Sequence, residues 1–234
     1  MFDINPYLDE FENAPVSARM RSTGHYLFRR KLDSGTALSM RRAIDQLAEN
    51  DSTEINYAGS EHRIWHAADK NAIFEPVRTM SNHFMSVLYG RSANAHNVLA
   101  IRNRPTPDGA ERTNVRWHLD SFRRQLKLFL FLTDVGENNG PLELVPRTHT
   151  PLFKMLNALP LKYYAISDFR NMSGNRRNWQ RIHDNTVKML AQRGYEPKPM
   201  KVAEGSFLLV DTSAVHRARP CQSGERYAVT IYHR

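Results

Sequence analysis

Apolar residues recur at helical spacing in two stretches of the N-terminal half. The first stretch covers residues 36–49 and follows Ser34 or Thr36 as the candidate cap. Its apolar positions are Ala37, Met40, Ile44 and Leu47. The second stretch has Pro76 in its first turn and stops at Gly90, with an apolar face of Val77, Met80, Phe84, Val87 and Leu88. Both predict amphipathic helices that cover a sheet.

Short apolar runs replace the helical pattern in the C-terminal half. They read NVLAIRN, QLKLFLFLTDV, GPLELVP, GSFLLVD and RYAVTIYH, and Gly, Pro, Asn and Asp separate them. An earlier run, HYLFRRKL at residues 25–32, has the same character. Short strands between turn residues are typical of an antiparallel barrel or double sheet. The predicted fold is therefore mainly β with flanking α-helices.

The predicted strand at residues 126–132 has two different faces. Every even position is Leu, whereas the odd positions are Lys127, Phe129 and Phe131. The leucine face suits packing against the helices. The other face suits a ligand cavity, although Lys127 could instead extend outward to solvent.

Two segments fall outside the barrel pattern. Residues 1–21 are mixed and polar, with Pro6 and Pro15, and are expected to form an arm packed on the main body. Strand patterning lapses over residues 151–200, and a basic helix is expected at 175–194. Its body-facing residues would be Trp179, Ile182, Val187 and Leu190. We interpret 151–200 as an insertion, either a lid or substrate wall or simple surface elaboration.

Composition fits one ordinary globular domain spanning residues 1–234. The chain is 41% hydrophobic and 24% charged, and no apolar run approaches the roughly 20 residues that span a bilayer. The start, MFDINPYLDEFE, is acidic where a signal peptide is basic and then apolar. Cys221 is the only cysteine, so no intrachain disulfide can form. We expect a cytoplasmic protein.

Positive charge is in excess and clustered. The 33 Lys and Arg residues against 24 Asp and Glu give a formal charge of +9. One cluster comprises Arg112, Arg116, Arg123, Arg124 and Lys127, and a second comprises Arg176, Arg177, Arg181, Lys188 and Arg193. Such clusters are compatible with nucleic-acid binding, with an anionic substrate, or with an ordinary solvated surface. Charge alone does not distinguish these three possibilities.

Four side chains carry the candidate chemistry. His118 and Asp120 are two residues apart, so on an extended strand they point the same way and can share a metal ion. His216 supplies a second imidazole, and Arg226 follows ten residues later, in the next strand. Two His and one carboxylate form the facial triad of non-heme Fe(II) oxygenases, which leaves positions for a co-substrate and O2. A guanidinium beside it suits a carboxylate of 2-oxoglutarate.

The sequence around these residues resembles the phytanoyl-CoA dioxygenase family of Fe(II)/2-oxoglutarate-dependent oxygenases. The resemblance lies in WHLDSF, LTDVGENNGPLELVPRTHT and GSFLLVDTSAVHRARPCQSGERYAVTIY, and more weakly in GHYLFRRKLDSGTALSMRRAIDQL. It implies a double-stranded β-helix, a cupin-like jelly roll with helices packed on one sheet. It also implies iron bound by His118, Asp120 and His216, with Arg226 on the distal carboxylate of 2-oxoglutarate and Phe129 beside that co-substrate.

The resemblance further implies the reaction: 2-oxoglutarate and O2 are consumed, succinate and CO2 are released, and the substrate is hydroxylated. Asp120 disfavours halogenation, because halogenating relatives have a small residue there. The sequence departs from the family at Arg147 and Thr148, where a Gly-Ser pair is usual, so an altered turn is expected. Ala218 replaces a hydroxyl residue that assists the arginine, leaving Thr230 or Lys127 as candidates for that support. His149 is expected to make a structural hydrogen bond.

Two other functions stay open. One is a barrel enzyme that uses Zn or Mn without redox chemistry, because two His and one carboxylate also form catalytic zinc sites. The other is a basic nucleic-acid-binding protein with a vestigial metal site. For the oxygenase, the arginines beside the metal motif favour a small anionic or carrier-linked substrate, and no oligomeric state is predicted.

Overall fold

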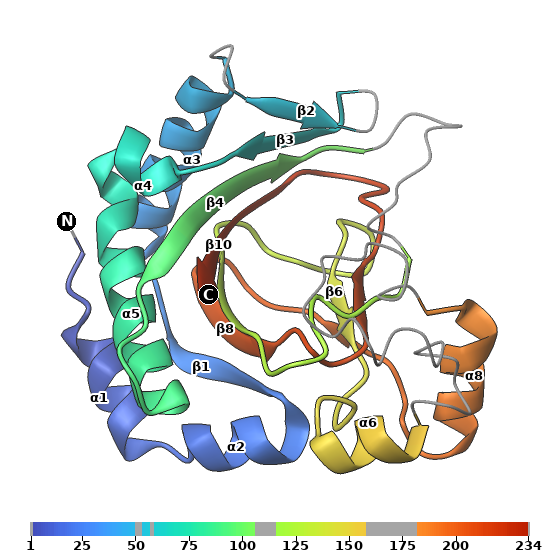
Figure 1. The fold of residues 1–234 in the computed structure, drawn as a ribbon. Coiled ribbons are helices and arrows are strands. Elements are labelled where there is room, and N and C mark those ends of the chain that lie inside the picture. The colour runs from blue at the N-terminus through green and yellow to red at the C-terminus, as the bar shows by residue number, and fades with distance from the viewer. Residues whose placement is uncertain (1, 50–52, 57–58, 106–115, 158–181, 234) are drawn as a thin grey trace.

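The computed structural model describes residues 2–49, 53–56, 59–105, 116–157 and 182–233. Ten strands form two antiparallel sheets (Figure 1). The large sheet has the order β1-β8-β5-β10-β4-β3-β2, and the small sheet has the order β7-β6-β9. The strands are β1 (His25–Lys31), β2 (Glu54–Asn56), β3 (Glu61–Ile64), β4 (Ala95–Asn103), β5 (Leu126–Phe131), β6 (Leu142–Leu144), β7 (Lys198–Met200), β8 (Ser206–Asp211), β9 (His216–Ala218) and β10 (Arg226–His233).

The two sheets face each other across an apolar layer. Phe131, Leu208 and Ala228 of the large sheet share a buried cluster with Leu142 and Leu144 of the small sheet. An isolated antiparallel bridge between His118 and His216 adds a further extended segment at the β9 edge of the small sheet. The predicted antiparallel double sheet is confirmed.

Helices cover the outer face of the large sheet (Figure 1). They are α1 (Asn5–Asn13), α2 (Val16–Thr23), α3 (Ser34–Ala48), α4 (Ala67–Lys70), the 3-10 turn η1 (Ala72–Phe74) and α5 (Glu75–Tyr89); α6 (Pro151–Asn157) and α8 (Asp184–Gln192) lie beside the small sheet. No helix among the described residues has both the length and the apolar character needed to cross a membrane.

Both predicted helices are present, with two corrections. The cap of α3 is Asp33, whose side chain accepts a hydrogen bond from the Thr36 amide at 2.8 Å, rather than Ser34 or Thr36. Helix α5 ends at Gly90, which adopts the left-handed φ of 65° that glycine favours. Val87, expected on the buried face of α5, is 53% exposed, and Ser81 and Met85 are buried instead.

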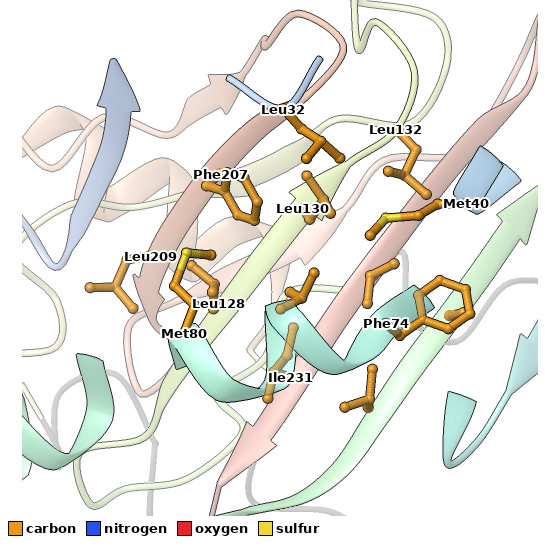
Figure 2. Close-up of a cluster of buried hydrophobic side chains, with 14 of the residues drawn as sticks. Leu32, Met40, Phe74, Met80, Leu128, Leu130, Leu132, Phe207, Leu209 and Ile231 are labelled. Atoms are coloured by element: carbon orange, nitrogen blue, oxygen red, sulfur yellow. The ribbon is translucent and has the colours of Figure 1, made fainter. Parts of the chain in front are cut away.

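The leucine face of β5 packs against the helices, as predicted. Leu128, Leu130 and Leu132 contact a cluster that includes Met40 of α3 and Met80 of α5 (Figure 2). Each of these side chains is fully buried. Removing one leucine side chain from such a core costs about 2–5 kcal/mol, so this layer fixes β5 and with it the opposite face of the strand.

The N-terminal arm contains the helices α1 and α2, which its mixed polarity did not predict. Phe11 of α1 stacks on Phe84 of α5, with ring centroids 4.3 Å apart. Glu10 accepts hydrogen bonds from the amides of Arg29 at 2.7 Å and Arg30 at 3.0 Å. Its carboxylate therefore satisfies backbone donors of the edge strand β1, which would otherwise need water or another strand.

The segment 151–200 contains helices and also a strand. Residues 198–200 form β7 and pair with β6, so the expected absence of strands is wrong at this end. Ile182, Val187 and Leu190 are buried against Trp117, as their predicted orientation requires. The basic helix expected at 175–194 corresponds to α8. Trp179 and the expected start of that helix at residue 175 lie outside the described residues.

The turn at Arg147 keeps a conformation that suits glycine. Arg147 has a φ of 71°, a left-handed backbone that β-carbons disfavour. Two contacts of the Arg147 side chain offset the cost of this backbone conformation. Its Nη2 donates to the Gly194 carbonyl at 2.6 Å, and its guanidinium lies 4.9 Å from the Tyr195 ring centroid. Position 147 thus has a backbone that glycine favours, and the arginine attaches the end of α8 to the barrel.

This turn yields a stability prediction. Arg147→Gly and Arg147→Ala both lose the contacts with Gly194 and Tyr195, but only alanine retains a β-carbon in the left-handed conformation. We expect the free energy of unfolding of Arg147→Ala to be about 1 kcal/mol below that of Arg147→Gly, measured by urea denaturation. Equal stability of the two variants would show that the positive φ carries no strain.

Candidate active site

Three side chains converge at the edge of the small sheet. His118, Asp120 and His216 each offer one ligand atom, and these atoms lie within 4.8 Å of one another. The two histidines pair through their backbones: the His118 amide donates to the His216 carbonyl at 2.9 Å, and the reverse bond is 3.0 Å. Their ring centroids are 4.3 Å apart. The strand expected at His118 is reduced to this single bridge, which still brings both rings together.

Both imidazoles are oriented by backbone carbonyls. His118 Nδ1 lies 2.8 Å from the Arg116 carbonyl oxygen, and His216 Nδ1 lies 2.9 Å from that of Ala214. A carbonyl oxygen only accepts hydrogen bonds, so Nδ1 carries the proton and Nε2 keeps its lone pair. The Nε2 atoms of His118 and His216 lie 3.9 Å and 3.8 Å from the Asp120 carboxylate. Metal-binding histidines are commonly supported in this way.

The protonation states also suit a metal ion. Burial, together with the neighbouring His118, lowers the pKa of His216 to about 4, so its ring is neutral at pH 7. Burial alone would raise the pKa of Asp120, but Lys127, His216 and His118 outweigh it and hold that pKa below its usual range. The site therefore presents a neutral imidazole and an ionised carboxylate.

The donor set fits a divalent transition-metal ion. Metal–donor distances of about 2.0–2.2 Å place adjacent donor atoms roughly 3 Å apart. The donor atoms of the three side chains would therefore need to move by on the order of 1 Å to bind one metal ion. Two nitrogens and one carboxylate oxygen suit both non-heme Fe(II) and catalytic Zn. These three residues could hold either metal.

Lys127 lies inside the barrel and contacts the site. Its Nζ is 2.7 Å from Asp120 Oδ2 and 4.0 Å from the Tyr232 ring centroid, and the residue is 6% exposed. The alternative in which Lys127 extends outward is wrong. Burial alone would lower the pKa of Lys127, but Asp120 and Tyr232 raise it above its usual value. The buried carboxylate thus has a buried counter-ion.

Arg226 begins β10 and is anchored from two sides. Its Nη2 donates to Asn103 Oδ1 at 2.7 Å, and its Nη1 donates to the Gly140 carbonyl. Gly140 has a φ of +79°, and a Cβ there would lie 3.1 Å from Arg226 Nη1. The same Cβ would lie 2.9 Å from the Arg219 carbonyl oxygen, so this backbone contact and the positive φ both favour glycine at position 140. These contacts supply the support that was expected from Thr230 or Lys127.

A relay of polar side chains extends behind the arginine. Asn103 Nδ2 donates to Glu61 Oε2 at 2.8 Å, and Arg63 Nε lies 2.8 Å from Glu61 Oε1. Asn103 and Glu61 are buried and lie opposite each other in the β3–β4 register. Sequence reasoning missed these residues, because the pairing of Asn103 with Arg226 is apparent only once the strand register is known.

The interior face of β10 continues beyond Arg226. Ala228 and Thr230 are on this face, because the alternate residues Tyr227, Val229 and Ile231 belong to the core beneath the helices. Thr230 pairs in register with Phe129 of β5, another interior residue. Ala218, predicted to replace a hydroxyl residue that assists the arginine, belongs to β9.

Two further side chains support the segment around His216. Thr148 accepts a hydrogen bond from the Val215 amide at 2.8 Å and donates to the Val145 carbonyl at 2.7 Å. His149 Nε2 lies 3.2 Å from the Arg21 carbonyl oxygen, which confirms the predicted structural hydrogen bond.

Lys154 of α6 joins the loops that follow Asp120 and precede His216. Its Nζ donates to the Phe122 carbonyl and to Ser213 Oγ, both at 2.8 Å, although it lies in a segment interpreted as an insertion. Burial lowers the pKa of Lys154 to about 8. Sequence reasoning missed this residue, because a lone lysine on a short helix gives no signal.

The Lys127–Asp120 pair yields a prediction for the metal-free protein. Lys127→Met leaves the Asp120 carboxylate buried without its counter-ion, so the free energy of unfolding should fall by about 3–5 kcal/mol in urea denaturation. The double variant Lys127→Met/Asp120→Asn removes both charges and should recover much of that loss. If the double variant were as unstable as Lys127→Met alone, the loss would come from packing rather than from the stranded charge.

Comparison with known proteins identifies related folds. No curated protein matches the chain. Among solved structures, the epimerase SnoN in complex with Fe3+, alpha ketoglutarate and nogalamycin RO has a TM-score of 0.68 at 14% identity, covering 97% of this chain and 84% of SnoN. EctD from S. alaskensis with 2-oxoglutarate and 5-hydroxyectoine has a TM-score of 0.67 at 12% identity, covering 94% of this chain and 75% of EctD.

HygX from Streptomyces hygroscopicus with nickel and 2-oxoglutarate bound has a TM-score of 0.61 at 11% identity, covering 94% of this chain and 86% of HygX. At these identities the likeness concerns the fold, and it confirms the cupin-like jelly roll with flanking helices. The sequence model of the phytanoyl-CoA dioxygenase (PhyH) family matches residues 18–228, which include the strands, His118, Asp120, His216 and Arg226. The chain therefore belongs to the phytanoyl-CoA dioxygenase family.

Proposed function

We propose that this protein is an Fe(II)/2-oxoglutarate-dependent oxygenase that hydroxylates a small anionic or carrier-linked metabolite. The observation that carries the proposal is the combination of two imidazoles and one carboxylate with a buried, doubly anchored Arg226. A hydrolytic zinc enzyme would need the three ligands but has no evident use for that guanidinium. Family membership and the co-substrates named for SnoN, EctD and HygX support the same conclusion.

Each proposed role follows from local chemistry. His118 and His216 would bind Fe(II) through Nε2, and Asp120 through a carboxylate oxygen. Bound iron and 2-oxoglutarate would supply the oxidising power, with O2 consumed and succinate and CO2 released. Arg226 would bind the distal carboxylate of 2-oxoglutarate with a guanidinium whose orientation Asn103 and Gly140 already restrict.

The interior aromatic residues would shape the co-substrate cavity. Phe129 is half-buried and lies nearly parallel to Phe131, with an interplanar angle of 13°. It pairs with Thr230, whose side chain is buried on the same interior surface. We propose that Phe129 excludes water beside 2-oxoglutarate and that Thr230 borders the same cavity. Lys127 would hold Asp120 ionised and oriented rather than contact 2-oxoglutarate.

Hydroxylation is the outcome that we propose. Asp120 supplies a carboxylate ligand where a halogenase would leave a position for chloride. Proteins of related fold include the epimerase SnoN and the carbocyclase SnoK, so this fold is compatible with more than one reaction. We also propose a cytoplasmic location, since the lone Cys221 is buried and has no cysteine partner in the chain.

Turnover of 2-oxoglutarate tests the proposed function. The purified protein, supplied with Fe(II), ascorbate and a library of small anionic metabolites, should form succinate only when both 2-oxoglutarate and O2 are present. Asp120→Ala should abolish succinate formation, because a metal ligand is lost. A protein that acts on a substrate with Zn or Mn and without 2-oxoglutarate would contradict the proposal.

The relay behind Arg226 gives a kinetic prediction. Asn103→Leu removes the acceptor of the Arg226 guanidinium, so the KM for 2-oxoglutarate should rise about tenfold while kcat changes little, as expected for lost uniform binding. Glu61→Gln retains an acceptor for Asn103 and should change the KM far less. An unchanged KM in a correctly folded Asn103→Leu protein would show that the contact between Asn103 and Arg226 contributes nothing to co-substrate binding.

A further inference from the structure

A cavity lies beside the loop that follows Asp120. It has a volume of about 360 Å³ and is formed by the end of α5, the start of β4, the end of β10 and the loop after Asp120. Six of its side chains are basic or aromatic: Tyr89, Arg91, His96, Arg124, Tyr232 and His233. None of the described residues that line it is acidic. The composition of its wall therefore favours an anion.

Two arginines flank one aromatic ring of the cavity. The guanidinium carbons of Arg91 and Arg124 lie 5.9 Å and 5.8 Å from the Tyr89 ring centroid. Arg124 is held in place because its Nη1 donates to the Leu88 carbonyl at 2.8 Å, and its Nε lies 3.9 Å from Asp211 Oδ2. Arg91 retains its guanidinium for a ligand on the same wall. Guanidinium groups bind phosphate, sulfate and carboxylate oxygens with good geometric match.

His233 contributes part of the cavity wall. The residue is 4% exposed, and its Nε2 lies 2.9 Å from Ser81 Oγ, so the ring is held in place from α5. It lines the cavity beside Tyr232, and its ring therefore reports on what the cavity binds.

The cavity also has aromatic walls and a short connection to the metal site. His96 meets the Tyr232 ring edge to face, with centroids 6.1 Å apart. The same Tyr232 ring lies 4.0 Å from Lys127 Nζ, which is 2.7 Å from the Asp120 carboxylate. Ser121, which lines the cavity, directly follows Asp120 in the chain. One layer of side chains thus separates the cavity from a proposed metal ligand.

We propose that this cavity binds an anionic group of phosphate or sulfate size carried by the substrate, with an attached ring or short stem against Tyr89 and Tyr232. Arg91 and Arg124 supply the charge, and the His96 and His233 rings line the wall beside them. Binding of the anion rests on the cavity alone, whereas its assignment to the substrate rests on the proposed oxygenase function.

Binding to the metal-free protein tests the anion site without turnover. Phenyl phosphate, titrated by calorimetry at constant ionic strength, should bind saturably and more tightly than inorganic phosphate. Arg91→Met and Arg124→Met should each weaken binding at least tenfold, whereas Arg42→Met, a matched change at an exposed arginine of α3, should leave it unchanged. His233 ring signals should shift in NMR spectra on binding.

Three results would overturn the anion site. These are the absence of saturable binding, equal weakening by Arg42→Met and Arg91→Met, and His233 signals that do not respond. Arg91→Met removes an exposed side chain, so it keeps the test valid if the more constrained Arg124→Met fails to fold.

The source of the anion is tested by turnover with matched pairs of phosphorylated and unphosphorylated metabolites. The wild type should prefer phosphorylated compounds, and Arg91→Met should raise their KM at least tenfold without changing the KM for 2-oxoglutarate. Turnover of uncharged compounds that phenyl phosphate does not inhibit would overturn the assignment to the substrate. Phenyl phosphate binding through Arg91 in a protein that never consumes 2-oxoglutarate would instead refute the oxygenase and leave the anion site standing.

Discussion

The reciprocal backbone pairing of His118 and His216 is the constraint on which the candidate site depends. These two hydrogen bonds, at 2.9 and 3.0 Å, join the segment around His118 to the edge of the small sheet. They bring two imidazoles from distant parts of the chain side by side. Asp120 then lies between that edge and the large sheet, where Lys127 meets it. The Asp120 carboxylate thus links the histidines at the small-sheet edge to Lys127 of the large sheet.

The buried charges of Asp120 and Arg226 are stabilised by different kinds of contact. At the metal end, Asp120 is balanced by Lys127, so the carboxylate stays ionised without a metal. At the other end, Arg226 is held by neutral acceptors, Asn103 and the Gly140 carbonyl, and the nearest compensating charge in the relay is Glu61. These contacts fix the direction of the Arg226 guanidinium, as its proposed role in binding a carboxylate requires.

Much of this arrangement was predictable from the sequence, because strand periodicity and residue spacing are local signals. The leucine face of β5, the stop of α5 at Gly90 and the triad with Arg226 all follow from such signals. Contacts that depend on strand register or on tertiary packing could not be predicted from such signals. Asn103, Glu61 and Lys154 acquire their roles only when distant segments of the chain meet. The helices of the first 21 residues were missed because their apolar positions are sparse. The left-handed Arg147 was missed because a side-chain contact replaces the usual glycine.

A crystal structure of the protein grown without oxygen, with Mn(II) and 2-oxoglutarate, tests the central claim most directly. The account predicts one metal ion bound by His118, Asp120 and His216, with 2-oxoglutarate on that ion and its distal carboxylate on Arg226. A metal ion at the three ligands with 2-oxoglutarate absent from Arg226 at saturating concentration would contradict it, as would a metal ion bound elsewhere.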